Sequence, residues 1–72
     1  MNNKTTKIYA LGRKIFTIRR ELKYSQNVLA EKLDISREHL AKIETAKRTV
    51  SLELLIDIAE QLNVKVRDLI DF

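Results

Sequence analysis

Two short apolar segments near the middle of the chain are separated by only a few residues, and no other feature constrains the fold as strongly. Within residues 28–33 and 40–43 the apolar positions recur every three or four residues, which is typical of helices of about two turns. Ser25 and Ser36 precede these segments, where a hydroxyl can accept a free amide hydrogen of the first turn. Two such helices joined only by Asp34–Ile35–Ser36 cannot fold back antiparallel and bury both faces. The connection therefore predicts helices set at a steep angle.

The pattern on both sides of this pair is also helical. Apolar residues spaced three or four positions apart predict a first helix over residues 7–22. Gly12 lies within it and is expected to mark a close contact between helices. Residues 45–50 are polar and basic and are expected to form a loop. Ser51 then begins a fourth helix, Asn63 closes it in the left-handed conformation, and a short fifth helix follows. The residues defining these faces are Ile8, Leu11, Ile15, Ile18 and Leu22, then Leu54, Leu55, Ile58, Ala59 and Leu62, then Val66, Leu69 and Ile70.

These elements predict an all-α fold, a compact bundle of five short helices. Residues 1–6 are expected to be a flexible tail and residues 7–72 a single domain, with the steep pair at its centre over 26–45. A steep pair of this kind is the helix-turn-helix unit, whose second helix projects from the surface and fits the major groove of DNA.

Composition excludes several classes of function. The 72 residues include no Cys and one His, so disulfides and thiolate metal sites are excluded and neither a metal nor a cofactor is expected. No apolar run approaches the ~20 residues of a membrane helix, and the polar N-terminus has no secretion signal, so a cytoplasmic protein is expected. An enzyme is not expected, because a Ser–His–Asp triad would need groups drawn from caps and turns.

The charge is distributed unevenly along the chain. Residues 1–50 contain 12 Lys or Arg and 5 Asp or Glu, a net charge of +7, whereas residues 51–72 contain 2 and 5, a net charge of −3. The sum is the +4 of the whole chain. A basic first part suits an anionic partner such as nucleic acid or a membrane surface, although a solvated charged face gives the same pattern.

A set of residues distributed over most of the chain resembles the phage-repressor and Cro-like helix-turn-helix domains, also called the XRE type. The similarity extends from about Gly12 to Leu69. It is carried by Gly12-x-x-Ile15-x-x-Ile18-Arg19, Ser25-Gln26-x-x-Leu29-Ala30-x-x-Leu33-x-Ile35-Ser36, Leu40-x-x-Ile43-Glu44, Lys47-Arg48, Ser51, Leu55-x-x-Ile58-Ala59-x-x-Leu62-x-Val64 and Leu69. The resemblance implies a lambda-repressor-like fold that binds specific double-stranded DNA as a transcriptional regulator, in this family most often a repressor.

The resemblance also implies roles for particular residues. The recognition helix would be about residues 36–45, with Arg37, Glu38 and Lys42 reading bases. Arg19 and Glu44 would form a partly buried ion pair that orients this helix. The expected phosphate contacts are Gln26 at the start of the second helix, Ser36 and Thr45 at the ends of the third, and Lys47 and Arg48 in the following loop, where minor-groove contact is also possible. His39 could touch a phosphate or a base.

Each of these residues also has a simpler interpretation. Glu38 and Lys42 can be an ordinary i,i+4 surface pair, Ser36 only a helix cap, and His39 a plain surface or half-buried residue.

The chain departs from the family pattern at turns and caps. Asp34, Ala46 and Asn63 stand where the family usually has Gly, and Lys65 stands where a Ser commonly caps the fifth helix. Thr49–Val50 replaces a common Asn-Pro. These departures concern local stability more than fold or DNA binding.

The resemblance leaves the mode of action open. Such proteins usually bind inverted repeats as dimers, so a homodimer is expected, with Ile70 and Phe72 covering either the core or a partner. The alternative is an antitoxin-like or other protein-interaction module whose partner, a toxin or polymerase, would contact the acidic segment from Ser51 onward. Lipid binding is disfavoured, because the core needs the apolar stripe of the first helix. The operator, the regulated genes and the direction of regulation are not encoded in any recognisable feature.

Overall fold

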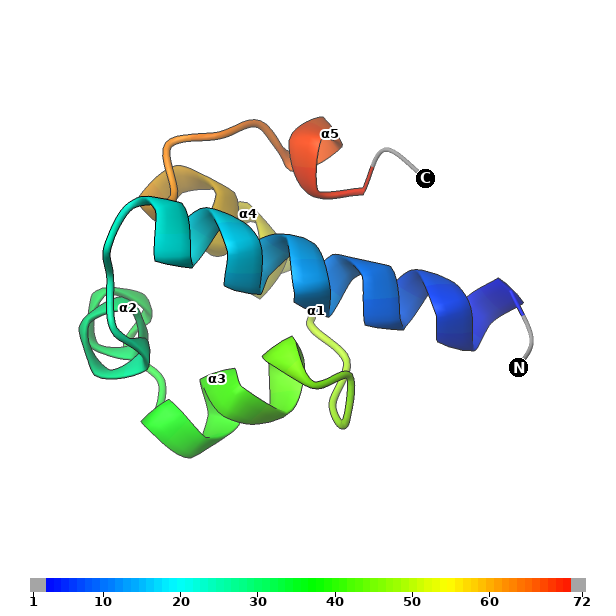
Figure 1. The fold of residues 1–72 in the computed structure, drawn as a ribbon, viewed down its shortest axis with the longest axis horizontal. Coiled ribbons are helices and arrows are strands. Elements are labelled where there is room, and N and C mark those ends of the chain that lie inside the picture. The colour runs from blue at the N-terminus through cyan, green and yellow to red at the C-terminus, as the bar shows by residue number, and fades with distance from the viewer. Residues whose placement is uncertain (1–2, 71–72) are drawn as a thin grey trace.

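The computed structural model describes residues 3–70 and confirms the predicted all-α architecture (Figure 1). Five helices follow in order: α1 (Asn3–Glu21), α2 (Gln26–Leu33), α3 (Arg37–Glu44), α4 (Leu52–Gln61) and α5 (Val66–Leu69). In Figure 1, α1 runs through the middle of the molecule with α3 below it, α5 above it and α4 behind it. Among residues 3–70 there is no strand.

The first helix begins earlier than predicted. It starts at Asn3, so residues 3–6, which the sequence analysis placed in a flexible tail, belong to α1. The physical reason is that adding residues to an existing helix needs no new nucleus, and this segment contains neither Pro nor Gly. Residues 1–2 of the expected tail, and Phe72, lie outside the described residues.

The three serine caps are present as predicted. The Oγ atoms of Ser25, Ser36 and Ser51 accept hydrogen bonds of 3.0, 2.9 and 3.1 Å from the backbone N–H groups three residues further on. Lys65 begins α5 without such a hydroxyl. Instead the Asp68 carboxylate, which lies in the first turn, accepts a 2.8 Å hydrogen bond from the Lys65 N–H. One half of a capping box thus replaces the serine cap.

The first four helices are each followed by a non-glycine residue in the left-handed region. These residues are Lys23, Asp34, Ala46 and Asn63, with φ between 56° and 62°. The conformation closes a helix by turning the next amides back onto its last carbonyls. Asp34 and Asn63 tolerate it because of their short polar side chains, whereas Lys23 and Ala46 adopt it at a larger steric cost.

A single hydrophobic core connects all five helices. Its fully buried large side chains are Ile15, Leu29, Leu40, Ile58, Leu62 and Leu69. Three residues of the predicted apolar faces are exposed instead: Leu22 is 41% exposed, because α1 ends at Glu21, and Val28 and Ile70 are each 42% exposed.

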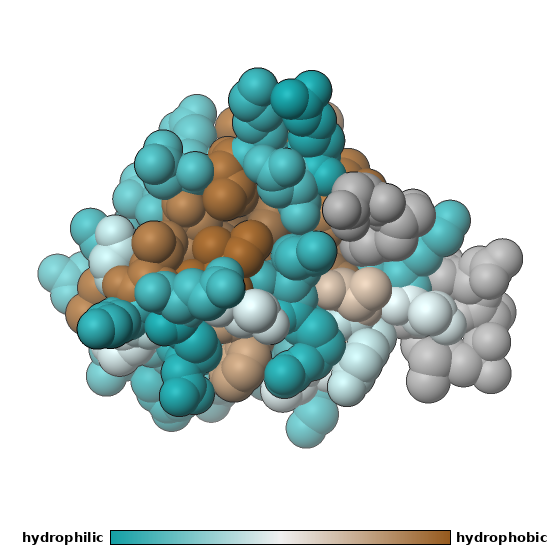
Figure 2. Space-filling view, turned by 45° about the horizontal axis from the view of Figure 1, so that its top comes forward, coloured by the Kyte–Doolittle hydropathy of each residue, from teal (hydrophilic) through white to brown (hydrophobic). Residues whose placement is uncertain are grey.

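Hydrophobic side chains also reach the surface. Figure 2, which brings the α4 and α5 side of the molecule forward, shows hydrophobic surface between hydrophilic side chains. Leu52 is 69% exposed, the most of any large hydrophobic side chain in the described part of the chain, and it lies one turn from Ile56 on α4. Within residues 3–70, no helix is both long enough and apolar enough to cross a membrane.

Candidate nucleic-acid interface

The connection between α2 and α3 sets the two helices steeply across each other. Asp34, in the left-handed conformation, directs the amides of residues 34 and 35 back onto carbonyls of the last turn of α2, at 3.1 and 3.0 Å. Ser36 then caps α3, so the direction of the chain changes within three residues. In Figure 1, α2 is seen almost end-on while α3 lies lengthwise. This is the arrangement that the short connection predicted.

One face of α3 packs against the rest of the protein and the other faces solvent. Leu40, Ile43 and Glu44 are buried. Among the predicted base-reading residues, Arg37, Glu38 and Lys42 are exposed, while His39 is half-buried and its backbone N–H donates to the Ser36 cap. The helix therefore presents a row of polar side chains that are free to reach a partner.

The Glu38 and Lys42 side chains form an i,i+4 pair with 3.9 Å between carboxylate and ammonium. Their side chains are 78% and 49% exposed, so the pair contributes little to stability. Neither group is committed to the fold, and both remain available for a ligand.

A buried ion pair joins the end of α3 to α1. The Glu44 carboxylate accepts hydrogen bonds from Arg19 Nε at 2.6 Å and from Arg19 Nη2 at 3.0 Å. The two side chains are only 2% and 5% exposed. Arg19 Nη1 donates a third hydrogen bond, of 2.8 Å, to the carbonyl oxygen of Tyr24 in the turn before α2. The pair thereby ties three segments together at the base of the helix-turn-helix unit.

Gln26 extends this network to the surface. Its Nε2 donates to Glu44 Oε1 at 3.0 Å, and its Oε1 lies 3.4 Å from Arg37 Nη1, a weak hydrogen bond. Arg37 is therefore directed over the start of α2 by a chain of contacts that begins at a buried salt bridge. Gln26 and Arg37 were predicted as separate DNA contacts, and the contact between them was not predicted.

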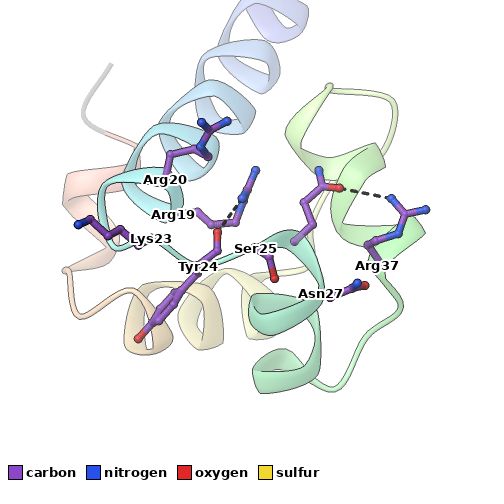
Figure 3. A pocket seen from close by; sticks show the side chains of 8 residues that line it. Arg19, Arg20, Lys23, Tyr24, Ser25, Asn27 and Arg37 are labelled. Atoms are coloured by element: carbon purple, nitrogen blue, oxygen red, sulfur yellow. Dashed lines mark hydrogen bonds between the residues drawn. The ribbon is translucent and has the colours of Figure 1, made fainter.

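The start of α2 lies in a hollow of about 650 Å³ whose charged lining residues are all cations (Figure 3). The hollow is lined by Arg19, Arg20, Lys23, Tyr24, Ser25, Gln26, Asn27 and Arg37. The N-terminal amides of α2 face the same region and favour negative charge. Arg20, Lys23 and Asn27 were absent from the predicted site, because their position depends on the left-handed turn at Lys23, which sequence reasoning missed.

The remaining predicted residues lie at the opposite end of α3. The Thr45 hydroxyl donates to the Ala41 carbonyl at 2.8 Å, so it is engaged within its own helix. Lys47 and Arg48 are exposed on the turn formed by Ala46. Residues at both ends of α3 therefore flank its exposed face, as phosphate-contacting groups would have to do.

This geometry defines a helix-turn-helix domain. The polar helix α3 is anchored to α1 by the buried ion pair and lies beside the cationic hollow at the start of α2. Among the described residues, no three His, Asp or Glu side chains gather to hold a metal ion. The chain matches the model of the family described as "Helix-turn-helix" over residues 15–69, and it belongs to that family.

Comparison with known proteins agrees with this assignment and with the predicted phage-repressor and Cro-like type. The chain is similar to the immunity repressor protein of Bacillus phage phi105, with 41% identity over 56 residues. The match covers 78% of this chain but only 39% of that repressor, so the chain spans well under half the length of this curated relative.

Solved structures give the same class of fold. The restriction-modification controller protein C.AhdI from Aeromonas hydrophila matches with a TM-score of 0.85 and 25% identity, covering 89% of this chain and 97% of that one. The biofilm regulator SinR, solved in complex with DNA, matches with a TM-score of 0.77 and 32% identity, covering 82% and 95%. The clp gene regulator ClgR from Corynebacterium glutamicum matches with a TM-score of 0.82 and 30% identity, covering 85% and 65%.

Proposed function

We propose that this chain binds specific double-stranded DNA, inserts α3 into the major groove, and represses transcription in the cytoplasm. The observation that carries the proposal is the anchored polar face of α3 beside a cationic hollow. A recognition helix must be held rigidly while its exposed side chains meet base edges, and adjacent cations must hold the phosphates. The family membership and the DNA complex of the similar regulator SinR support the same function.

The proposed contacts divide into two groups. Arg37 and Lys42 donate to guanine, and Glu38 accepts from cytosine or excludes other bases. The phosphate-contacting group comprises Gln26, Ser36, Thr45, Lys47 and Arg48, joined by Arg20, Lys23 and Asn27 from the hollow, with His39 a further neighbour of the same surface. The base-reading residues determine which sequence is bound, and the phosphate-contacting residues determine the register of the protein on the duplex.

In vitro selection from random duplex DNA at near-physiological salt, read by sequencing, tests the proposal. Enrichment of a defined motif is the expected result. Binding without enrichment that weakens steeply as salt rises would mean attraction to phosphate alone. That result would contradict sequence-specific binding and favour the protein-interaction alternative, with the acidic segment from Ser51 onward as the next place to search for a toxin or polymerase contact.

Arg37→Ala is expected to relax one position of the selected motif and to weaken binding to the optimal site by about 1–3 kcal/mol. The reason is that a guanidinium bridging guanine O6 and N7 discriminates at a single base pair. Repeating the selection shows whether a motif position is relaxed, and fluorescence anisotropy measures the loss of affinity. Arg67→Ala, an equal loss of charge from the exposed surface of α5, is the control and should leave the motif unchanged. A uniform loss of affinity with no relaxed position would assign Arg37 to the phosphates.

We further propose that two copies act together. A helix of two turns contacts few base pairs, so a single copy would bind weakly, whereas two copies on an inverted repeat would combine their contacts. The exposed pair Leu52 and Ile56 supports this, because an apolar pair of this kind is suited to burial against its own equivalent. Leu52 also follows the loop after α3 directly, so pairing there would join the two copies close to their recognition helices.

Leu52→Glu is therefore expected to convert a dimer into a monomer of 8.4 kDa, as measured by light scattering after size-exclusion chromatography. A buried carboxylate at this interface would be strongly unfavourable. Val28→Glu, which places the same charge on an exposed apolar site of α2, serves as the control and should remain dimeric. A wild-type chain that is monomeric both in solution and on the selected DNA would contradict the proposal.

A further inference from the structure

Three arginines of α1 surround one aromatic ring. The guanidinium carbon of Arg13 lies 4.4 Å from the centroid of the Phe16 ring, and those of Arg19 and Arg20 lie at 5.2 and 5.6 Å. Phe16 is half-buried, so its ring is fixed in place while part of it remains at the surface. The ring attracts each cation and draws together three side chains that repel one another.

The charges of this cluster are only partly compensated. Arg19 is neutralised by Glu44, but Arg13 and Arg20 are exposed. Neither has an ion pair with a carboxylate among the described side chains, residues 6–70. A guanidinium that lies against a ring keeps its N–H groups directed outward, ready to bind an anion in bidentate geometry. Two exposed guanidiniums held in this way have the geometry that binding an external anion requires.

The position of the cluster identifies that anion. Gly12 and Arg19 face the end of α3, and positions 13, 16 and 20 lie next to them around α1. Arg20 also lines the cationic hollow together with Arg37 of α3 (Figure 3). The row of Arg13, Phe16 and Arg20, called here the arginine ridge, therefore continues the hollow along α1, away from the start of α2.

We propose that the arginine ridge is a phosphate-binding strip that extends the DNA contact of this chain beyond the base pairs read by α3. The proposal rests on the proposed function, since it adds contacts to the same duplex. The backbone positions of Arg13 and Arg20 lie about 10 Å apart along the helix axis, so their side chains approach the Phe16 ring from different turns and can contact different phosphates. Phe16 acts as a positioning residue that holds both guanidiniums. The ridge contributes affinity and register but reads no sequence.

The test compares Arg13→Gln, Arg20→Gln and the double variant with the wild type by measuring the dissociation constant over a series of salt concentrations. Removing one phosphate contact should lower the slope of log affinity against log salt by about 1, so the double variant should lose about 2. The motif enriched from random DNA should stay the same. Phe16→Leu, which changes no charge, should lower the slope in the same direction by releasing the two guanidiniums.

Lys7→Gln is the matched control. It removes the same charge from the same helix at an exposed position that lies about 120–140° around the helix axis from the ridge arginines. Thermal unfolding of every variant shows whether the fold is intact. Equal slopes for the double variant and Lys7→Gln, in proteins that remain folded, would overturn the proposal.

The same measurements separate this proposal from the proposed function. If the wild type enriches a motif but the ridge variants have the same salt dependence of affinity as the wild type, sequence-specific binding is supported and the phosphate-binding role of the ridge is wrong. If the wild type enriches no motif but the ridge variants lose slope, the ridge binds phosphate and sequence reading by α3 fails. Loss of slope together with loss of the motif would mean that the ridge acts by orienting α3, which also overturns the proposal.

Discussion

Replacing Glu44 by alanine is expected to lower the free energy of unfolding by about 3–5 kcal/mol. The variant removes the carboxylate that accepts two hydrogen bonds from Arg19 and one from Gln26. Arg19 would stay buried at the α1–α3 junction with no carboxylate beside it, keeping only its hydrogen bond to the Tyr24 carbonyl and its contact with the Phe16 ring. Because a domain of this size has a total stability of about the same amount, most of the variant should be unfolded at 37 °C. Circular dichroism during heating measures the change.

Two further variants establish the cause. Glu38→Ala removes an exposed carboxylate from the same helix and should change stability by no more than about 0.5 kcal/mol. The double variant Arg19→Met with Glu44→Met removes both charges and should be more stable than Glu44→Ala, because no unpaired guanidinium is left behind. If the double variant is no more stable than the single one, the uncompensated charge is not the source of the loss.

DNA affinity should fall together with stability, for a reason that can be separated from unfolding. Gln26 is held by Glu44 and in turn contacts Arg37, so the loss of Glu44 releases both proposed DNA-contacting residues. In an osmolyte such as sucrose, which favours the folded state, binding of the refolded variant to the selected site should still be weaker than that of the wild type in the same solution. Unchanged affinity of the folded variant would mean that the network does not position Arg37.

The helices could be predicted because local signals agreed with the tertiary structure. Ser25, Ser36 and Ser51 each lie directly before a segment whose apolar residues have helical spacing. Each of them caps the N-terminus of the helix that follows. The start of α1 was missed because residues 3–6 carry neither a cap nor an apolar stripe, and the helix continues through them by propagation alone. The αL turn at Lys23 was missed because lysine gives no sign of a positive φ.

The positions of the candidate-site residues could be predicted where they follow the linear order of the chain, and could not where they depend on side chains from distant segments. The exposed positions of α3 follow from helical periodicity once the buried ones are known. The Arg19–Glu44 pair came from family resemblance, since no spacing rule relates residues 25 positions apart. The hollow between α1 and α2 was not predicted, because Arg20, Lys23 and Arg37 meet only after two turns have been built.

Gly12→Ala should also strongly destabilise the domain, although alanine is the better helix former. A Cβ atom at this position would lie 2.7 Å from the Ile43 carbonyl oxygen and 2.8 Å from that of Glu44. Both are backbone atoms that cannot rotate away, so α1 and α3 would have to separate. Because both neighbours are rigid backbone atoms, the cost of overpacking should lie at the upper end of its usual range, about 3 kcal/mol, against a gain in helix propensity of about 1 kcal/mol. We expect a net loss of about 2 kcal/mol, or roughly 8–16 °C in Tm.

Whether Gly12→Ala lowers or raises Tm shows whether the α1–α3 junction is rigid or whether its two helices can separate. Thr17→Ala, at an exposed position of the same helix, gains propensity without meeting another helix and should raise Tm slightly. Gly12→Val, which adds three carbons and a β-branch, should leave the domain unfolded. A rise in Tm for Gly12→Ala similar to that for Thr17→Ala would mean that the two helices can separate at little cost. The ion pair between Arg19 and Glu44 would then tolerate displacement, and the rigid support proposed for the recognition helix would be wrong.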